Sequence, residues 1–152
     1  MEIKLKPIAM VKNSRIEPTD DNWGDIISEI TLVADLTEEA FRGIEDFSHL
    51  EIVFHFDQAD PSEESKTSRH PRGNTHWPLT GIFAHRGKDR PNHIGLCIAE
   101  LIKREGKTLF VKGLDAINGT PVVDIKPVVK GFLPRKEIKE PQWSVELMQN
   151  YW

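Results

Sequence analysis

Apolar and polar side chains alternate in several short stretches of the chain. The clearest stretch is residues 50–57, where Leu50, Ile52, Phe54 and Phe56 alternate with mostly polar neighbours. A period of two sends one set of side chains into a core and the other toward solvent, so this stretch predicts a half-buried strand. Similar patterns predict further strands at residues 4–11, 28–36, 81–84, 94–102, 108–114 and 121–127.

Turn residues separate these predicted strands at short intervals. Gly106 lies in the polar stretch 103–107, and the pair Asn118-Gly119 is a typical turn before residues 121–127. Residues 59–79, rich in Pro, Gly, Ser and Arg, predict a long loop, which in a compact domain is usually functional or mobile.

One early helix is predicted after Thr37, which is a suitable N-cap before Glu38 and Glu39, and it should end near Asp46. A second short helix is expected around residues 145–149. Short strands, frequent turns and one or two short helices predict a mainly β protein with a single antiparallel sheet closed into a barrel.

The length of 152 residues predicts a single domain. We expect residues 1–136 to form the barrel and residues 137–152 to form a C-terminal extension packed on the same domain. No apolar run approaches the roughly 20 residues of a membrane-spanning helix, and the first residues lack a signal-peptide core. We therefore expect a cytoplasmic protein that does not associate with membranes.

Charge is distributed unevenly along the chain. The net charge is −4, but residues 66–112 hold ten lysines and arginines against three acidic residues. The segment 85–93 alone holds Arg86, Lys88 and Arg90 between two apolar stretches. Arginine suits carboxylates and phosphates, so this segment predicts an anion site; a solvated charged hairpin is the alternative.

Histidines and the single cysteine give little support to a metal site. All six histidines lie between residues 49 and 93, but none of their spacings matches a helical metal motif, and we expect no bound metal. Cys97 is the only cysteine, which excludes disulfides within the chain and multi-cysteine metal sites. The glycine patterns of Rossmann and P-loop nucleotide sites are also missing. The histidines are His49, His55, His70, His76, His85 and His93.

Four stretches carry longer motifs in a fixed order: residues 42–50, 54–58, 86–96 and 114–127. In this order they resemble the TsaA/TrmO family over about residues 5–130. The resemblance implies a single-sheeted barrel, usually a homodimer, that binds S-adenosylmethionine without a Rossmann fold. It also implies methyl transfer to N6 of threonylcarbamoyladenosine at position 37 of tRNA.

The resemblance further implies which residues contact the cofactor. An aspartate would balance the sulfonium, an arginine would bind the methionine carboxylate, and the turn before residue 119 would bind the adenosine. The loop around Trp23 would complete the pocket. The implied cofactor residues are Asp57, Gln58, Arg86, Leu96, Leu114, Asp115, Ala116, Ile117 and Asn118.

Methylation of N6 requires removal of its proton, so a general base or a water relay is needed. Asp124, Asp115 and His55 are candidates, with Lys126 orienting one of them, and the sequence leaves the choice open. Four cations would contact tRNA phosphates: Arg69, Arg72, Lys88 and Arg90. Two other functions stay open, a non-catalytic nucleotide- or RNA-binding barrel and a metal-dependent hydrolase that uses the histidines.

Overall fold

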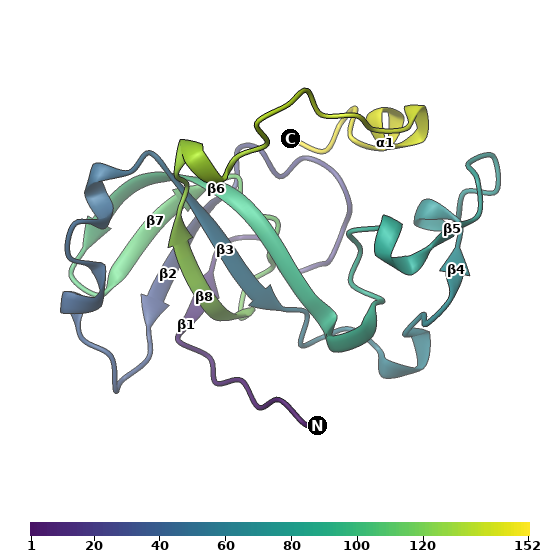
Figure 1. Ribbon diagram of the computed structural model, residues 1–152. Coiled ribbons are helices and arrows are strands. Elements are labelled where there is room, and N and C mark those ends of the chain that lie inside the picture. The colour runs from purple at the N-terminus through teal and green to yellow at the C-terminus, as the bar shows by residue number, and fades with distance from the viewer.

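The computed structural model describes residues 1–152 and is organised around a six-stranded barrel (Figure 1). The barrel strands are β1 (Ala9–Lys12), β2 (Ile27–Leu32), β3 (His49–His55), β6 (Ile94–Glu105), β7 (Thr108–Lys112) and β8 (Pro121–Pro127). They close in the order β1-β2-β7-β6-β3-β8, and each neighbouring pair is antiparallel. The predicted mainly β fold with a single closed antiparallel sheet is confirmed.

Large and small side chains complement each other across β3 and β6 inside the barrel. Ile52 pairs with Cys97 and Phe54 pairs with Gly95, and all four residues are buried. A Cβ atom added to Gly95 would lie 2.4 Å from Cε2 of Phe54, so only glycine fits beside this ring. The alternation seen in residues 50–57 therefore does place its apolar face in the core.

Some predicted elements are shorter or differently built. The first strand starts at Ala9 rather than at residue 4, because Pro7 has no N–H to donate to a neighbouring strand. The prediction of one helix from Thr37 is wrong: two 3₁₀ segments form instead, separated by Gly43 with a φ of +82°. These segments are η1 (Glu38–Phe41) and η2 (Ile44–Asp46).

The β3–β6 connection, residues 56–93, extends away from the barrel as a separate lobe (Figure 1). Two short strands pair within this lobe. The prediction of a strand at residues 81–84 is wrong, because residues 82–84 form a 3₁₀ turn in which the His85 N–H donates to the Ile82 carbonyl. Its elements are η3 (Pro61–Glu63), β4 (Ser68–Arg69), η4 (Pro71–Gly73), β5 (Thr80–Gly81), η5 (Ile82–Ala84) and η6 (Pro91–His93).

After β8 the chain passes η7 (Lys130–Phe132) and forms α1 (Gln142–Leu147), slightly earlier than the predicted residues 145–149. Helix α1 lies beside the β3–β6 connection, where Nε1 of Trp77 donates to Oε2 of Glu146 at 2.8 Å (Figure 1). Residues 150–152 then run along the loop that follows β1. None of the helices has the length and apolar character required to cross a membrane.

Candidate functional site

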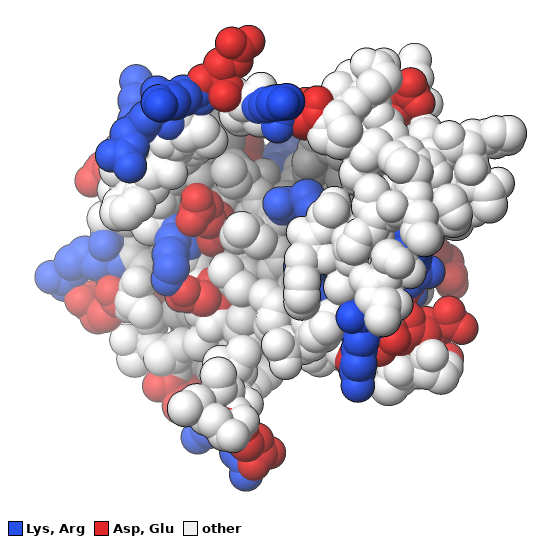
Figure 2. All heavy atoms as spheres, turned by 45° about the vertical axis from the view of Figure 1, so that its right-hand side comes forward, with Lys and Arg blue, Asp and Glu red and all other residues white.

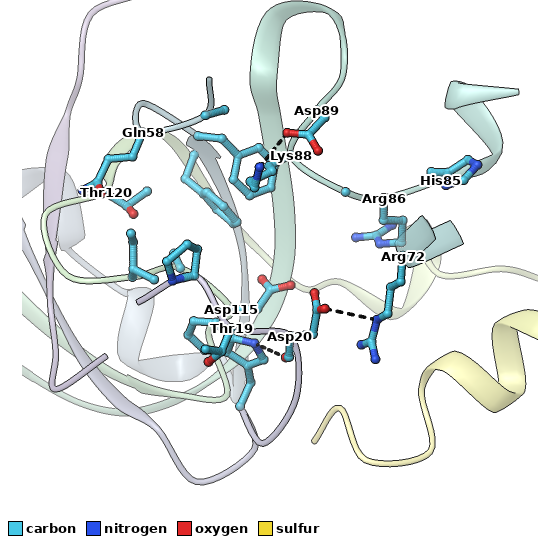
Figure 3. A pocket seen from close by; sticks show the side chains of 18 of the residues that line it. Thr19, Asp20, Gln58, Arg72, His85, Arg86, Lys88, Asp89, Asp115 and Thr120 are labelled. Carbon is cyan, nitrogen blue, oxygen red and sulfur yellow. Dashed lines mark hydrogen bonds and ion pairs between the residues drawn. The ribbon is translucent and has the colours of Figure 1, made fainter. Parts of the chain in front are cut away.

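A cavity of about 390 Å³ lies where the barrel meets the β3–β6 connection. In the space-filling view, basic side chains are visible inside a hollow of this side of the molecule (Figure 2). Four stretches of the chain and one isolated aromatic residue line the cavity (Figure 3). They are the loop after β1 (Pro18, Thr19, Asp20, Trp23), the end of β3 and its continuation (Phe54, Phe56, Asp57, Gln58, Ala59), the connection (Arg69, Arg72, Ile82, His85, Arg86, Gly87, Lys88, Asp89), the turn before β8 (Asp115, Ala116, Ile117, Thr120) and Tyr151.

Basic side chains form one wall, but most of them are already neutralised. Arg69 and Lys88 share the carboxylate of Asp89, with nitrogen–oxygen distances of 3.1 and 2.6 Å. Arg86 forms no ion pair; its Nη2 donates to the carbonyl oxygen of Leu96 at 2.5 Å and it is otherwise exposed. Arg86 is therefore the lining cation best able to meet an anionic group of a ligand.

Arg72 ties two walls of the cavity together. Its Nη2 lies 2.8 Å from Oδ1 of Asp21, its Nε lies 3.7 Å from Oδ2 of Asp20, and its side chain is 24% exposed. Its guanidinium also lies 5.9 Å from the centre of the Tyr151 ring. In Figure 3, Arg72 and Arg86 lie on one side of the cavity, opposite Gln58 and Thr120. The ion pairs thus hold the connection against the loop that follows β1.

Asp115 presents a carboxylate that is only half satisfied. Its Oδ2 accepts a hydrogen bond from the Tyr151 hydroxyl at 2.7 Å, while its Oδ1 is buried and has no partner. Burial and the neighbouring Asp115 carboxylate raise the pKa of the Tyr151 hydroxyl, which therefore remains a donor. A buried acceptor without a partner is costly, so a ligand that donates to Oδ1 would remove that cost.

The floor of the cavity is apolar. The rings of Phe54 and Phe56 meet edge to face with centroids 5.2 Å apart, and Ile82, Ala116 and Ile117 complete the surface. Apolar floors with a few converging polar groups are typical of small-molecule sites. Here the polar groups suit a ligand with an anionic group, hydrogen-bond donors and a flat apolar part.

The turn that carries Asp115 is fastened to the loop after β1. Nδ2 of Asn13 donates to the Ala116 carbonyl at 2.8 Å, and the Asn13 N–H donates to Oδ1 of Asn118 at 3.1 Å. The hydrogen bond from the Thr120 N–H to the Ile117 carbonyl closes the turn. These bonds hold the turn at the cavity edge.

Six of the nine cofactor residues named from the resemblance line the cavity, and three do not. Leu114 is fully buried in the core, Asn118 is exposed and bonded to Asn13, and Leu96 points outward from β6 with 44% exposure. Only the carbonyl of Leu96 approaches the site, through Arg86. The six that line it are Asp57, Gln58, Arg86, Asp115, Ala116 and Ile117.

The candidate general bases lie elsewhere, except for Asp115. Asp124 and Lys126 form an ion pair with each other on β8. The rings of His55 and His93 meet edge to face, with their centroids 6.1 Å apart. None of Asp124, Lys126 and His55 lines the cavity. Of the predicted phosphate-binding cations, Arg69, Arg72 and Lys88 line it, whereas Arg90 donates to the His85 carbonyl at 2.8 Å.

Sequence reasoning missed Tyr151, Thr19 and Asp20 as lining residues, whereas His85 lies in the predicted anion segment 85–93. Tyr151 is the only tyrosine in the chain, but nothing in its spacing links it to Asp115, 36 positions earlier. The six histidines are dispersed, and no group of three or more His, Cys, Asp or Glu side chains is arranged to hold a metal ion. The cluster needed by a histidine-based metal hydrolase is thus not assembled.

Comparison with known proteins identifies relatives over most of the chain. Residues 12–132 match the family described as "tRNA-methyltransferase O N-terminal domain". A human protein named "tRNA (adenine(37)-N6)-methyltransferase" is 37% identical over 113 residues, which cover 74% of this chain and 25% of that protein. A "Probable S-adenosyl-L-methionine-binding protein" of Methanothermobacter thermautotrophicus is 35% identical over 131 residues, covering 84% of this chain and 90% of that protein.

The fold is also similar to a solved structure. The crystal structure of TrmO from Pseudomonas aeruginosa superposes with a TM-score of 0.73 and 27% sequence identity. The match covers 91% of this chain and 61% of that one. The chain thus spans only about a quarter of the human relative and less than two thirds of the Pseudomonas protein.

Proposed function

The chain belongs to the tRNA-methyltransferase O family, and we propose that it transfers a methyl group from S-adenosylmethionine to N6 of threonylcarbamoyladenosine at position 37 of tRNA. The observation that carries the proposal is the cavity, which combines the unpaired cation of Arg86 with the free Oδ1 of Asp115 above an apolar floor. The names of the human and Methanothermobacter relatives support the same reaction and cofactor.

The residues of the cavity fit this cofactor. When bound, S-adenosylmethionine supplies a methyl group on a positively charged sulfur, which leaves as a neutral thioether. Arg86 would bind the carboxylate of its methionine part, since a guanidinium can pair with a carboxylate through two hydrogen bonds. Asp115 would accept from a hydroxyl or amino group through Oδ1, and Phe56 and Ile117 would cover the adenine.

The acceptor nitrogen must lose a proton when the new bond to the methyl carbon forms. N6 of threonylcarbamoyladenosine is a urea-type nitrogen and a weak nucleophile, so a proton acceptor is needed close by. Asp57 lines the cavity, is exposed and has no side-chain hydrogen bond or ion pair. We therefore propose Asp57, directly or through one water molecule, as the proton acceptor.

The proposed tRNA partner needs free cations, and those at the cavity wall are mostly paired with aspartates. Residues 130–139, between β8 and α1, are exposed and contain one acidic residue, Glu137. None of the basic side chains of this segment forms an ion pair, so they can neutralise phosphates. They are Lys130, Arg135, Lys136 and Lys139.

We also propose a homodimer that forms through the outer face of β6. Three apolar side chains of this strand remain exposed: Leu96 at 44%, Ile98 at 47% and Ile102 at 46%. Exposed apolar side chains along one face of a strand are typical of an association surface. Light scattering should report twice the mass of the chain, and Ile98→Glu should give the monomer mass with an unchanged circular dichroism spectrum. A monomeric wild-type protein would contradict this part of the proposal.

We propose a cytoplasmic location as well. Cys97 is a free, buried thiol, and thiols persist in the reducing cytoplasm. The proposed tRNA substrate and cofactor are both available in that compartment.

The proposed function is tested by incubating the protein with methyl-labelled S-adenosylmethionine and tRNA. Label should enter tRNA that carries threonylcarbamoyladenosine and should not enter the same tRNA without that modification. Arg86→Ala should weaken cofactor binding measured by calorimetry, whereas Asp57→Asn should lower turnover even when cofactor and tRNA are saturating. Binding of nucleotide or RNA without any transfer of label would favour a non-catalytic binding barrel instead.

A further inference from the structure

Tyr151, in the segment 150–152, forms part of the cavity wall although this segment lies outside the residues that match the family. The family match ends at residue 132, and Tyr151 is the only later residue that lines the cavity. This segment therefore contributes a side chain to the proposed cofactor site that the family motifs do not contain.

Backbone contacts dock this segment against the loop after β1. The N–H of Asn22 donates to the carbonyl of Asn150 at 2.9 Å, and the N–H of Trp23 donates to the carbonyl of Tyr151 at 2.8 Å. Gly24 allows the close approach, since a Cβ added there would lie 2.7 Å from the carbonyl carbon of Trp152. The position of the Tyr151 side chain is thus set by backbone packing.

The Tyr151 hydroxyl reaches from this segment to the carboxylate of Asp115. The bond is 2.7 Å long and uses Oδ2, which leaves Oδ1 of this cavity-lining residue buried and without a partner. The donor stays protonated at neutral pH, because burial and Asp115 raise the pKa of the phenol. A carboxylate held through one oxygen has its second oxygen in a defined direction.

We propose that Tyr151 is a positioning residue that orients Asp115, so that Oδ1 accepts a hydrogen bond from the adenosyl part of the bound cofactor. The inference rests on the proposed cofactor and names a determinant of its affinity. Because Oδ1 would contact the adenosyl part, the effect should be the same for S-adenosylmethionine and for its demethylated product.

A double-mutant cycle on ligand affinity tests this role. Calorimetry with S-adenosylmethionine and with S-adenosylhomocysteine is applied to wild type, Tyr151→Phe, Asp115→Asn and the double variant. Tyr151→Phe, which keeps the ring and loses the hydroxyl, should raise the Kd of both ligands about tenfold. The double variant should bind no more weakly than Asp115→Asn alone, because the hydroxyl acts only through that carboxylate.

Docking of the segment is measured separately by hydrogen exchange of the Asn22 and Trp23 amides. Both amides should stay protected in Tyr151→Phe and should exchange faster in Gly24→Ala, which should also raise the Kd. Gly131→Ala is the matched control, since a Cβ there meets nothing within 4 Å.

Two results would overturn the inference. One is that Tyr151→Phe binds both ligands as tightly as wild type; the other is that the fold-increases in Kd of the two single variants multiply in the double variant. Failure of the wild-type protein to bind either ligand would instead refute the proposed function on which the inference depends.

Discussion

Two residues on the inward face of β6, behind the cavity, are packed closely against their neighbours: Gly95 and Cys97. Gly95 leaves room for the Phe54 ring, which is 1% exposed and also lines the cavity. Next to it on the same inward face of β6 lies Cys97, whose Sγ donates to the Gly113 carbonyl at 3.3 Å. Changes at these positions should therefore alter stability as well as the site.

Gly95→Ala should destabilise the protein by about 1–3 kcal/mol, the usual range for overpacking a core. The added Cβ would collide with the Phe54 ring and push it toward the cavity. The free energy of unfolding is measured by urea denaturation, with Gly81→Ala as control because a Cβ there meets nothing within 4 Å. Equal loss in both variants would show that the Phe54 contact is not the cause.

Stability should fall in alkaline solution because of Cys97 and Tyr151. Burial raises the pKa of the Cys97 thiol above its ordinary value of 9.0 and that of the Tyr151 hydroxyl above 10.0. Above pH 9 the unfolded chain releases these protons while the folded protein keeps them, so the unfolded state binds fewer protons and stability drops as pH rises. The contribution of each group to the free energy of unfolding is fully present below its ordinary pKa and is lost as the pH rises above that value.

The expected slope is up to about 1.4 kcal/mol per pH unit for each group once its unfolded form is ionised. Urea unfolding at several values between pH 7.5 and 10.5 measures it, and Cys97→Ala or Tyr151→Phe should each make the slope shallower. A free energy of unfolding that is constant over this range would contradict the role of these two groups. The same conclusion would follow if the variants had the same slope against pH as the wild type.

At the scale of elements, the cavity exists because three segments outside the barrel sheet are fastened to one another. The β3–β6 connection supplies the basic wall, the loop after β1 supplies Asp20 and Trp23, and residues 150–152 supply Tyr151. Arg72 joins the connection to the loop through Asp21 and also lies near the Tyr151 ring. The site should therefore loosen when this junction is removed, even though the barrel stays folded.

Arg72→Met should weaken binding of S-adenosylmethionine several-fold and leave the thermal midpoint of the barrel nearly unchanged. The paired aspartates would be left without their cation, so the two walls would no longer hold their relative positions. Calorimetry measures the affinity, and Arg42→Met is the control because Arg42 forms an exposed local pair with Glu39, at 2.6 Å, and does not line the cavity. Equal effects of the two variants would refute the role of the junction.

At the scale of the whole molecule, the chain carries a net negative charge but has one exposed basic segment that can contact an anionic partner. The net charge is −4, yet residues 130–139 present four lysines and arginines and one acidic residue. This segment runs between the barrel and α1, on the opposite side of the molecule from the N-terminus (Figure 1). Binding of the proposed tRNA partner should therefore depend on the cations of this segment more than on other surface cations.

Replacing Arg135 and Lys136 by glutamine should weaken tRNA binding and reduce its salt dependence. Each lost phosphate contact should lower the slope of log K against log salt by about 0.7–0.9. Filter binding between 50 and 200 mM salt measures the slope. The control replaces Lys4 and Lys6 by glutamine, at the other side of the molecule, and a slope reduced equally by both pairs would refute a specific role of residues 130–139.

Local patterns in the sequence predicted the barrel and several residues of the candidate cavity. Alternation is encoded by adjacent residues, so the inward face of residues 50–57 and the strands at residues 94–102, 108–114 and 121–127 were predictable from local pattern. Asp57, Arg86 and Asp115 were identified because each lies within a long motif, and all three line the cavity.

Which side chains share the cavity depends on how distant segments pack against one another. Leu96, Asp124 and Lys126 lie on strands beside the site yet do not line the cavity, since outward and inward positions depend on register and on how the barrel closes. Tyr151 meets Asp115 across 36 positions through the docking of a segment that has no motif. Local periodicity carries no information about such long-range contacts, because they form only once distant segments have packed together.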